Sequence, residues 1–354
     1  MRVFEQAASP RELGFGLALA PNAIAALREL GVADTVLSLG FQPQRAEFRR
    51  MKGSVLKRIE MPPGALGGPM LVALRPALHG ALLDAVDPST LVLGQRVISF
   101  SVANDRVALR LTDGATAEGD LLVGADGVAS VVRRGLHPGE QPPRHSGLVA
   151  VRGVVHGALE HLGDRDAVLY LGPGVESTFI RASESGIYWY LSLAQELIPA
   201  GLRDPAAIIA TMAPRFDPTF RAITSATTDI RADELFDRDP LPRWGAGPVT
   251  LLGDAAHPVL PQTGQGAAQA MVDAVTLARA LDNSDVDAGL RAYERERQPK
   301  TAALLAQGRR TARLMAATNP VVCGLREWVL RALPAKTFAR FYVRINRPAG
   351  THTP

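Results

Sequence analysis

One stretch of the chain, residues 248–281, constrains the fold more than any other, because a strand, a loop and a helix follow one another in it. The apolar run Pro248–Gly253 predicts a short buried strand. Asp254 follows the strand, and after a loop Gly264-Gln265-Gly266 opens a predicted helix over 267–281. The free N–H groups at a helix N-terminus favour negative charge. This segment therefore predicts an α/β protein with a ligand site at the end of a buried strand.

Two other predicted strands also end near an acidic residue. Residues 2–5 form one that ends at Glu5, and residues 121–126 form one that ends at Asp126, before a helix over 128–136. In dinucleotide-binding βαβ units, an acid at a strand end binds ribose hydroxyls about 20 residues after a Gly-rich phosphate loop. The only early GxG, residues 14–16, follows Glu5 instead of preceding it. A surface acid and a helix cap are the competing interpretations of Glu5 and Asp126.

Helices and a hairpin are predicted between these motifs. Pro21 begins a helix that stops at Gly31, and a second helix is predicted over 70–86, with Arg75 just before its first turn. An arginine there can pair with a phosphate or a buried acid. Strands are predicted over 91–94, 97–104 and 107–112, and Asp113-Gly114 is read as the turn that makes the last two a hairpin.

The middle of the chain reads as an antiparallel sheet. Residues 148–194 alternate polar and apolar side chains in the manner of strands with one covered face. Tyr188, Trp189 and Tyr190 stand in sequence in a chain that is only 5% aromatic. They could line a pocket for a flat substrate or pack in the core, and alternation allows only one face of the three to point inward. Helices over 206–216 and 218–224 and a strand over 230–237 are expected to follow.

Composition limits the class of protein. The chain has 354 residues, of which 47% are hydrophobic and 21% charged, as in ordinary globular proteins. No apolar run reaches the ~18 residues of a membrane span, and no signal peptide is evident. The single cysteine, Cys323, is expected to be buried and inert, and it favours a reducing cytoplasm. Residues 301–354 hold nine Lys/Arg and one acid, Glu327, which predicts the solvated face of C-terminal helices or a surface for an anionic partner.

Three motifs together resemble those of the single-component, class A FAD-dependent aromatic monooxygenases, the p-hydroxybenzoate hydroxylase-like group, in the style of salicylate and urate hydroxylases. They are Arg2-Val-Phe-Glu5 with Pro21-Asn22-Ala23, Leu122–Ser130, and Leu252–Pro258 with Gly264-Gln265-Gly266. The resemblance implies an α/β fold in which a parallel, Rossmann-like FAD-binding sheet is interleaved with an antiparallel substrate domain and followed by C-terminal helices. The implied ranges are 1–40, 71–145 and 246–300 for FAD binding, 41–70 and 146–245 for substrate, and 301–354 for the C-terminal helices.

The resemblance also implies a role for each matching residue on the adenine side of FAD. Glu5 would bind the adenosine ribose, and Arg75 would contact the FAD. Val97 would flank the adenine, and Asp126 would belong to the motif shared by FAD and NAD(P)H handling.

At the flavin end, Asp254 would bind the ribityl–pyrophosphate part. The isoalloxazine would be cradled by Gly264, Gln265, Gly266 and Ala267. A helix N-terminus there suits the negative charge that a reduced flavin develops. Pro261 would lie where oxygen adds to the flavin, His257 would organise the loop or act in catalysis, and Tyr188 would contact the substrate.

The implied reaction uses NAD(P)H, O2 and a small aromatic or polyketide-like substrate. NAD(P)H reduces FAD, O2 forms a flavin C4a-hydroperoxide, and that species hydroxylates the ring. We expect no metal, no nucleic-acid partner, no membrane association, a cytoplasmic location, and a monomer or homodimer. The alternatives are a flavin-dependent reductase or dehydrogenase, a halogenase, whose W-x-W-x-I-P motif the chain lacks, or a shortened form with weak FAD binding and little turnover.

The sequence departs from the family pattern in two places. The family's GxGxxG strand–loop–helix unit is missing, so we expect an N-terminally shortened form that lacks about 30 residues. Val272 stands where the family usually has an acid, and Asp273 follows it.

Overall fold

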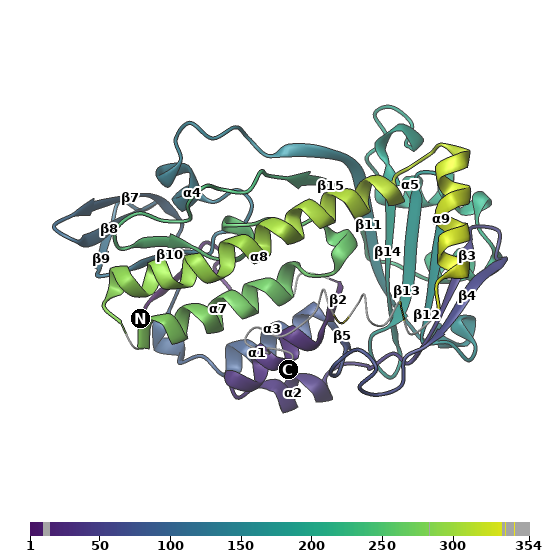
Figure 1. Ribbon diagram of the computed structural model, residues 1–354, viewed down its shortest axis with the longest axis horizontal. Coiled ribbons are helices and arrows are strands. Elements are labelled where there is room, and N and C mark those ends of the chain that lie inside the picture. Colours follow the sequence, from purple (N-terminus) through teal and green to yellow (C-terminus); the bar gives the residue numbers. More distant parts are fainter. Residues whose placement is uncertain (10–14, 283, 335–336, 338–342, 344–354) are drawn as a thin grey trace.

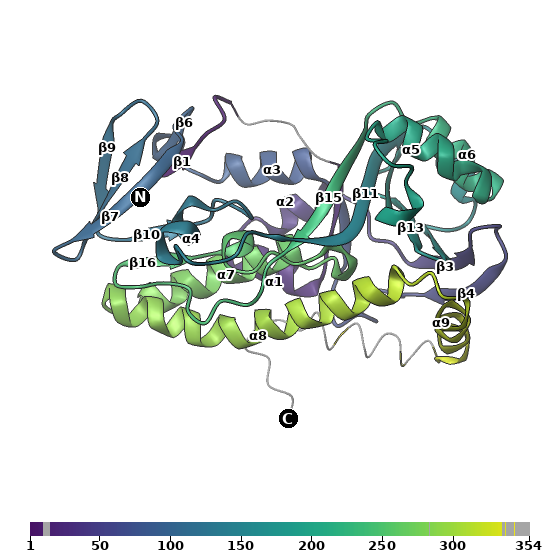
Figure 2. The ribbon, with the colours of Figure 1, turned by 90° about the horizontal axis from the view of Figure 1, so that it is seen from above.

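A computed structural model describes residues 1–9, 15–282, 284–334, 337 and 343. A large sheet lies at one end of the molecule and short parallel strands lie at the other, with the long helix α8 (Val286–Met315) running between them (Figures 1 and 2). This arrangement confirms the expected α/β fold with both parallel and antiparallel strands and with C-terminal helices.

The parallel strands form two pairs. β1 (Val3–Glu5) pairs with β6 (Leu91–Leu93), and β10 (Leu122–Gly124) pairs with β16 (Val249–Leu251). Helix α4 (Val131–Leu136) follows β10 and is shorter than predicted, because residues 127–130 form the turn in which Ser130 caps the helix. Glu5, Asp126 and Asp254 therefore lie at or just after the carboxyl ends of parallel strands, where ligands bind in α/β sheets.

The first helices confirm one prediction and correct another. α1 (Pro21–Glu29) begins with proline and is followed by Gly31 at φ +73°, as the sequence predicts. The helix predicted over 70–86 is wrong in its first turn, because Leu71–Leu74 is strand β5, paired with β2 (Gly16–Leu19). A short apolar run does not distinguish strand from helix, and here burial in the sheet decides. α3 (Arg75–Asp84) begins only at Arg75.

The predicted hairpin turn is also wrong. β7 (Val97–Ala103) and β8 (Arg106–Leu111) are joined by Asn104 and Asp105, whose φ angles of 52° and 56° suit a two-residue hairpin turn. Asp113-Gly114 instead connects β8 to β9 (Thr116–Gly119), a strand that the sequence did not reveal. Both turns carry residues that tolerate positive φ, so residue type alone could not rank them.

The large sheet has seven strands in the order β15-β11-β14-β13-β12-β3-β4. β12 and β3 run parallel, and every other pair is antiparallel. The strands are β3 (Arg45–Arg50), β4 (Val55–Glu60), β11 (Arg144–His156), β12 (Ala167–Gly172), β13 (Val175–Arg181), β14 (Gly186–Ala194) and β15 (Ile230–Asp237).

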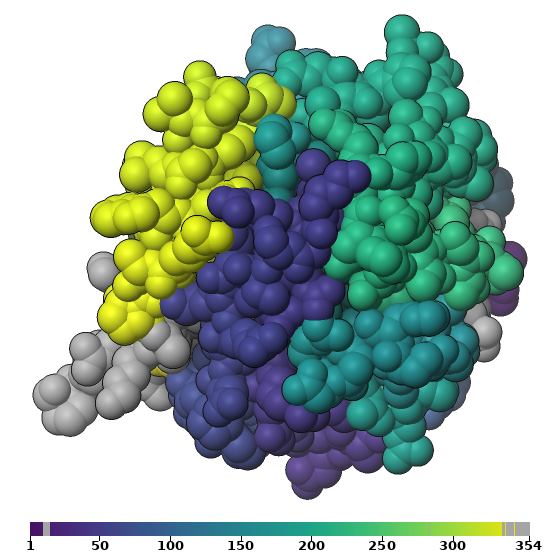
Figure 3. All heavy atoms as spheres, turned by 90° about the vertical axis from the view of Figure 1, so that its right-hand side faces the viewer, coloured from purple at the N-terminus to yellow at the C-terminus, as the bar shows by residue number. Residues whose placement is uncertain are grey.

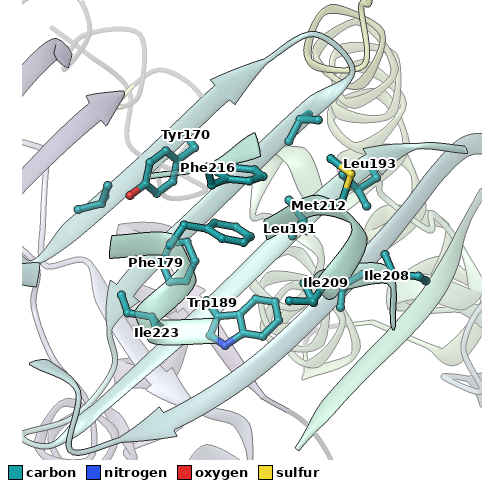
Figure 4. Packing of buried hydrophobic residues seen from close by; sticks show 14 of the residues in the cluster. Tyr170, Phe179, Trp189, Leu191, Leu193, Ile208, Ile209, Met212, Phe216 and Ile223 are labelled. Atoms are coloured by element: carbon teal, nitrogen blue, oxygen red, sulfur yellow. The ribbon is translucent and has the colours of Figure 1, made fainter. Parts of the chain in front are cut away.

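The two faces of this sheet have different roles. One packs under α5 (Pro205–Met212) and α6 (Pro218–Ser225), where Trp189 and Phe179 join an aromatic core (Figure 4). Trp189 donates its indole N–H to Thr227 at 2.9 Å. Tyr188 and Tyr190 point to the opposite face, where they pack with Leu260 and the end of α8. Alternation along β14 therefore separates the tryptophan from the two tyrosines.

The C-terminal part consists of α7 (Gly266–Asp282), α8 and α9 (Pro320–Ala332). α9 lies beside β4, where Lys57 donates to the backbone oxygen of Leu330 at 3.1 Å (Figure 3). Cys323 is buried, as predicted. Among the described residues, no helix combines the length and the apolar character that crossing a bilayer requires. Within the same ranges, no three His, Cys, Asp or Glu side chains are grouped to ligate a metal ion.

Candidate functional site

The loop between β16 and α7 has a conformation that depends on two glycines. Gly253 has φ +61°, and a Cβ there would lie 3.1 Å from the Cβ of Ala270 on α7. Gly264 has φ +63°, in the left-handed region, two residues before α7 begins. A side chain would strain the backbone at both positions. These glycines therefore let the loop turn tightly on each side of Pro261.

Asp273, on α7, holds this loop by hydrogen bonds. The carboxylate is completely buried and accepts hydrogen bonds from Nε2 of His257 at 2.5 Å, the backbone N–H of Gly253 at 3.0 Å and Nε of Arg297 at 2.6 Å. Burial alone would raise the pKa of Asp273, but the hydrogen bond and charge of His257 and the charge of Arg297 hold it below its usual range. The acid that the family usually has at position 272 stands one residue later here, at Asp273. Its hydrogen bonds hold the loop, although the difference looks minor in the sequence.

Arg133 on α4 anchors the same loop from another side. Its side chain is fully buried and donates to the backbone oxygens of Ala255 at 2.9 Å and Ala256 at 3.0 Å. The carboxylate of Glu140 balances its charge. Sequence reasoning missed Arg133, although it follows the Leu122–Ser130 motif directly. Its partners lie more than 120 residues further along the chain, so no local pattern indicates the contact.

Gln265 connects the loop to the first motif. Its side-chain oxygen accepts from Nδ2 of Asn22 at 3.1 Å and from Nε2 of Gln269 at 3.0 Å. Asn22 is the central residue of Pro21-Asn22-Ala23 at the start of α1, and its side chain is buried. The three motifs of the sequence therefore meet around one loop, although up to 243 residues separate them.

Two opposite charges stand unpaired beside this loop. The side chains of Asp254 and Arg75 are exposed, and within the described ranges neither forms a side-chain hydrogen bond or ion pair. Protein that crowds around the Asp254 carboxylate raises its pKa, although the nearby charges of His257 and Arg75 act in the opposite direction. The carboxylate is accessible, and the charge of Arg75 is close enough to influence its pKa.

The remaining residues predicted for the adenine side lie at other strand ends. Glu5 is exposed and accepts from the N–H of Ala7 at 2.7 Å, and its backbone oxygen accepts from Gln95, two residues before Val97. Asp126 accepts from the N–H of Val131 at 2.6 Å, so its carboxylate caps α4, as the competing interpretation held. Neither acid contacts the loop that carries Asp254 and Pro261.

The loop also meets the tyrosine face of the sheet. Gln262, next to Pro261, donates from Nε2 to Tyr190 Oη at 3.0 Å and to Ser192 Oγ at 3.2 Å. Burial raises the pKa of Tyr190 above its ordinary value of 10.0, so its phenol stays protonated. Because Gln262 stands between Pro261 and Gly264, the sequence could have marked it as a loop residue of the site. Its partners on β14 are too distant in the sequence to be predicted in this way.

Tyr188 lies on the same face, against strand β2. A Cβ on Gly16 would come within 2.4 Å of Cγ of Tyr188, so the ring packs directly on the glycine backbone. Burial raises the pKa of Tyr188, and the charge of Arg152 opposes the shift. The early GxG of the sequence thus provides space for this ring at its second glycine. Tyr188 and Tyr190 therefore lie on the face of the sheet that the loop meets through Gln262.

Comparison with known proteins gives a consistent result. A family model described as "FAD binding domain" matches residues 1–307. Aurachin C monooxygenase/isomerase from Stigmatella aurantiaca is 32% identical over 341 residues, which cover 94% of this chain and 88% of that protein. 3-Amino-4-hydroxybenzoate 2-monooxygenase from Streptomyces cremeus is also 32% identical, over 94% of this chain and 85% of its own length.

A solved structure shares the fold. Klebsiella pneumoniae HpxO, complexed with FAD and uric acid, superposes with a TM-score of 0.89 at 24% identity and covers 97% of this chain and 89% of its own.

Proposed function

This chain belongs to the FAD binding domain family, among FAD-dependent aromatic monooxygenases, and from that premise we propose that it hydroxylates a small aromatic substrate on the tyrosine face of its sheet. The observation that carries the proposal is the contact of Gln262 with Tyr190 and Ser192. It supports the proposal because it joins the loop of the FAD-binding motif to the tyrosine face of the sheet.

The residues present at the start of α7 fit an FAD molecule. A Cβ on Gly264 would meet no atom within 4 Å, and that of Gly266 only Asp254 Oδ1 at 3.9 Å, so a ligand can approach the backbone closely. We propose that the N-terminus of α7, from Gly264 to Ala267, holds the flavin, that Asp254 accepts from ribityl hydroxyls, and that Arg75 pairs with phosphate.

We further propose that Glu5, Val97 and Asp126 lie on the adenine side. Glu5 is supported by its exposed position at the end of a parallel strand, and Val97 by its closeness to Gln95, which contacts Glu5. For Asp126 the hydrogen bonds to α4 support a positioning role instead of direct contact with the cofactor.

When bound, FAD would supply the redox chemistry that takes electrons from NAD(P)H and activates O2. The chain supplies the surroundings. Backbone N–H groups at the start of α7 would stabilise negative charge. Leu260 and Tyr188 belong to one hydrophobic cluster and would exclude water. We propose that Pro261, between Leu260 and Gln262 in the chain, lies close to the flavin. His257 is buried against Asp273 and Trp244, so we propose that it positions the loop and does not touch the substrate.

The substrate class and the assembly are also part of the proposal. Relatives include enzymes named for 6-hydroxynicotinate, 3-hydroxybenzoate and a 4(1H)-quinolone, which supports a hydroxylated aromatic or heteroaromatic substrate. We propose that the seven-stranded sheet, residues 41–70 and 146–245, is the substrate domain, that 1–40, 71–145 and 246–300 bind FAD, and that 301–354 form the C-terminal helices. A monomer or homodimer in the cytoplasm remains our expectation.

The test of this function is product analysis of the FAD-loaded protein. With NADH or NADPH, O2 and a panel of phenolic acids and quinolones, we expect NAD(P)H consumption that one substrate stimulates, together with a hydroxylated product. ¹⁸O₂ should place one labelled atom in that product. Consumption that yields only peroxide, or reduction of the substrate without oxygen incorporation, would contradict the proposal and favour a reductase.

Tyr188→Phe is expected to lower the fraction of NAD(P)H oxidation that yields hydroxylated product, because the phenol is a protonated donor on the proposed substrate face. The ring and its packing on Gly16 are kept, so FAD content should not change. The ratio of product to NAD(P)H consumed is the measurement. A Tyr170→Phe variant, on the opposite face of the sheet, is the control and should leave the ratio as it is. An unchanged ratio in Tyr188→Phe would remove Tyr188 from the site.

A further inference from the structure

A carboxyl group with an unsatisfied oxygen lies on the tyrosine face of the sheet. Glu176 is on β13, directly across from Ser192 on β14, so the two side chains share a face. Oε2 of Glu176 is buried and has no hydrogen-bond partner among the described residues. Leaving a buried acceptor unsatisfied is costly, and native proteins seldom do so without a functional reason.

A second unsatisfied atom lies in the same cluster. Gln262 uses Nε2 to reach Ser192 and Tyr190, and its Oε1 is buried without a partner in the described part of the chain. Whichever way the amide is turned, one of its two polar atoms remains unpaired. Ser192 thus has the Gln262 amide on one side and Glu176 across the strand pair. Two incomplete polar groups therefore border the surface that carries Tyr190.

The positive charge that acts on Glu176 forms no ion pair with it. The charge of Arg326 on α9 acts to lower the pKa of Glu176, but among the described residues no ion pair joins its guanidinium to the Glu176 carboxyl. The Arg326 guanidinium donates to backbone oxygens, with Nη1 on Leu314 and Met315 and Nη2 on Gly172, while its Nε is buried without a partner among the described residues. Within those residues, Arg326 therefore acts on Glu176 through its charge and donates no hydrogen bond to Oε2.

We propose that Glu176 determines substrate choice by accepting a hydrogen bond from an N–H or O–H group on a neutral aromatic ring held against Tyr190. The inference rests on the proposed function, because it takes the tyrosine face as the substrate site. A donor on the ring would supply the hydrogen bond that Oε2 of Glu176 lacks. A ring carboxylate in the same place would meet a like charge whenever Glu176 is ionised, and it brings no donor of its own.

Glu176 is also set to change its charge near neutral pH. Burial raises its pKa to about 7, while the charge of Arg326 lowers it. The phenols of Tyr190 and Tyr188, whose pKa values burial raises above 10.0, lie on the same face, and the charge of Arg152 acts on both. Neither phenol changes charge between pH 6 and 8. The strength of Glu176 as an acceptor should therefore rise across that interval.

The experiment is isothermal titration of the FAD-loaded protein with three probes on one scaffold: 4(1H)-quinolone, 1-methyl-4-quinolone and quinoline-4-carboxylate. A hydrogen bond to a charged acceptor predicts that the wild-type chain binds the N–H probe about 10- to 100-fold more tightly than the N-methyl probe at pH 8. The carboxylate should bind more weakly than either. Glu176→Gln should lose most of the preference for the N–H probe.

The control and the pH dependence separate this role from a structural one. Glu184→Gln, an exposed acid in the turn after β13, should behave like the wild type. For the wild type, affinity for the N–H probe should fall from pH 8 to pH 6, because protonation weakens the acceptor, and Glu176→Gln should show no such slope.

Equal affinity for the N–H and N-methyl probes, no measurable binding of the N–H probe, or an unchanged preference in Glu176→Gln would each overturn the inference. A loss of thermal stability in Glu176→Gln with the preference intact would do the same. Because titration needs no turnover, failure of hydroxylation contradicts the proposed function separately.

Discussion

Asp273→Asn is expected to lower the free energy of unfolding by about 3–5 kcal/mol, the usual cost of removing one partner of a buried ion pair. The substitution leaves Arg297, which is 2% exposed, without its counter-charge. It also weakens the hydrogen bonds that His257 and Gly253 donate to the carboxylate. Urea or thermal unfolding of the chain without added FAD measures the effect directly.

Two variants make this result specific to the buried pair. Asp282→Asn removes an acid at the exposed end of the same helix and should change stability by less than about 0.5 kcal/mol. Asp273→Asn combined with Arg297→Met removes the stranded cation as well and should recover part of the loss. A loss below about 1 kcal/mol in Asp273→Asn would show that the anchor contributes little.

The Asp273 carboxylate should also make the stability of the folded chain depend on pH in acid. The pKa of Asp273 lies below its ordinary value of 3.8 in the folded chain, so its contribution is complete above that value and is lost as the pH falls further. The wild type should therefore lose stability more steeply than Asp273→Asn below about pH 4. Unfolding measured between pH 3 and pH 7 tests this, and parallel curves for the two proteins would contradict it.

Asp254→Ala is expected to weaken FAD binding by about 10- to 100-fold, the equivalent of one hydrogen bond to a charged group. The carboxylate has no hydrogen-bond partner among the described residues and stands exposed beside the start of α7, where it would accept from the cofactor. Quenching of FAD fluorescence on titration with protein gives the affinity. The matched control is Asp84→Ala at the exposed end of α3, which should bind FAD as the wild type does.

The stability of Asp254→Ala without FAD separates a binding role from a structural one. Crowding raises the pKa of Asp254, which means that folding disfavours its charged form at neutral pH. Removing the carboxylate should therefore leave stability equal or slightly higher while the cofactor binds more weakly. Reduced stability together with unchanged FAD affinity would show that Asp254 serves the fold and not the ligand.

The correct predictions from sequence were those with a local cause. Pro21 begins α1 because proline suits a first helical turn, and Gly31 follows the end of α1 because glycine accepts a positive φ. The alternation of residues 148–194 marked the antiparallel strands, and it also implied that Trp189 would point away from its tyrosine neighbours. The errors were local ambiguities, since Leu71–Leu74 can be strand or helix until β2 pairs with it.

By itself the sequence determined the family, the cofactor class and the segments that form the FAD motif, because these depend on glycines, acids and strand ends at short, fixed spacings. Only the tertiary structure decided how the loop 253–266 is held: by Asp273 with Arg297, by Arg133, and by Asn22 through Gln265. It also decided that Gln262 meets Tyr190 and that Glu176 lies beside them with an unpaired oxygen. The hydrogen bonds among these contacts join residues from 24 to 243 positions apart, and side chains paired across that distance leave no periodic pattern in the sequence.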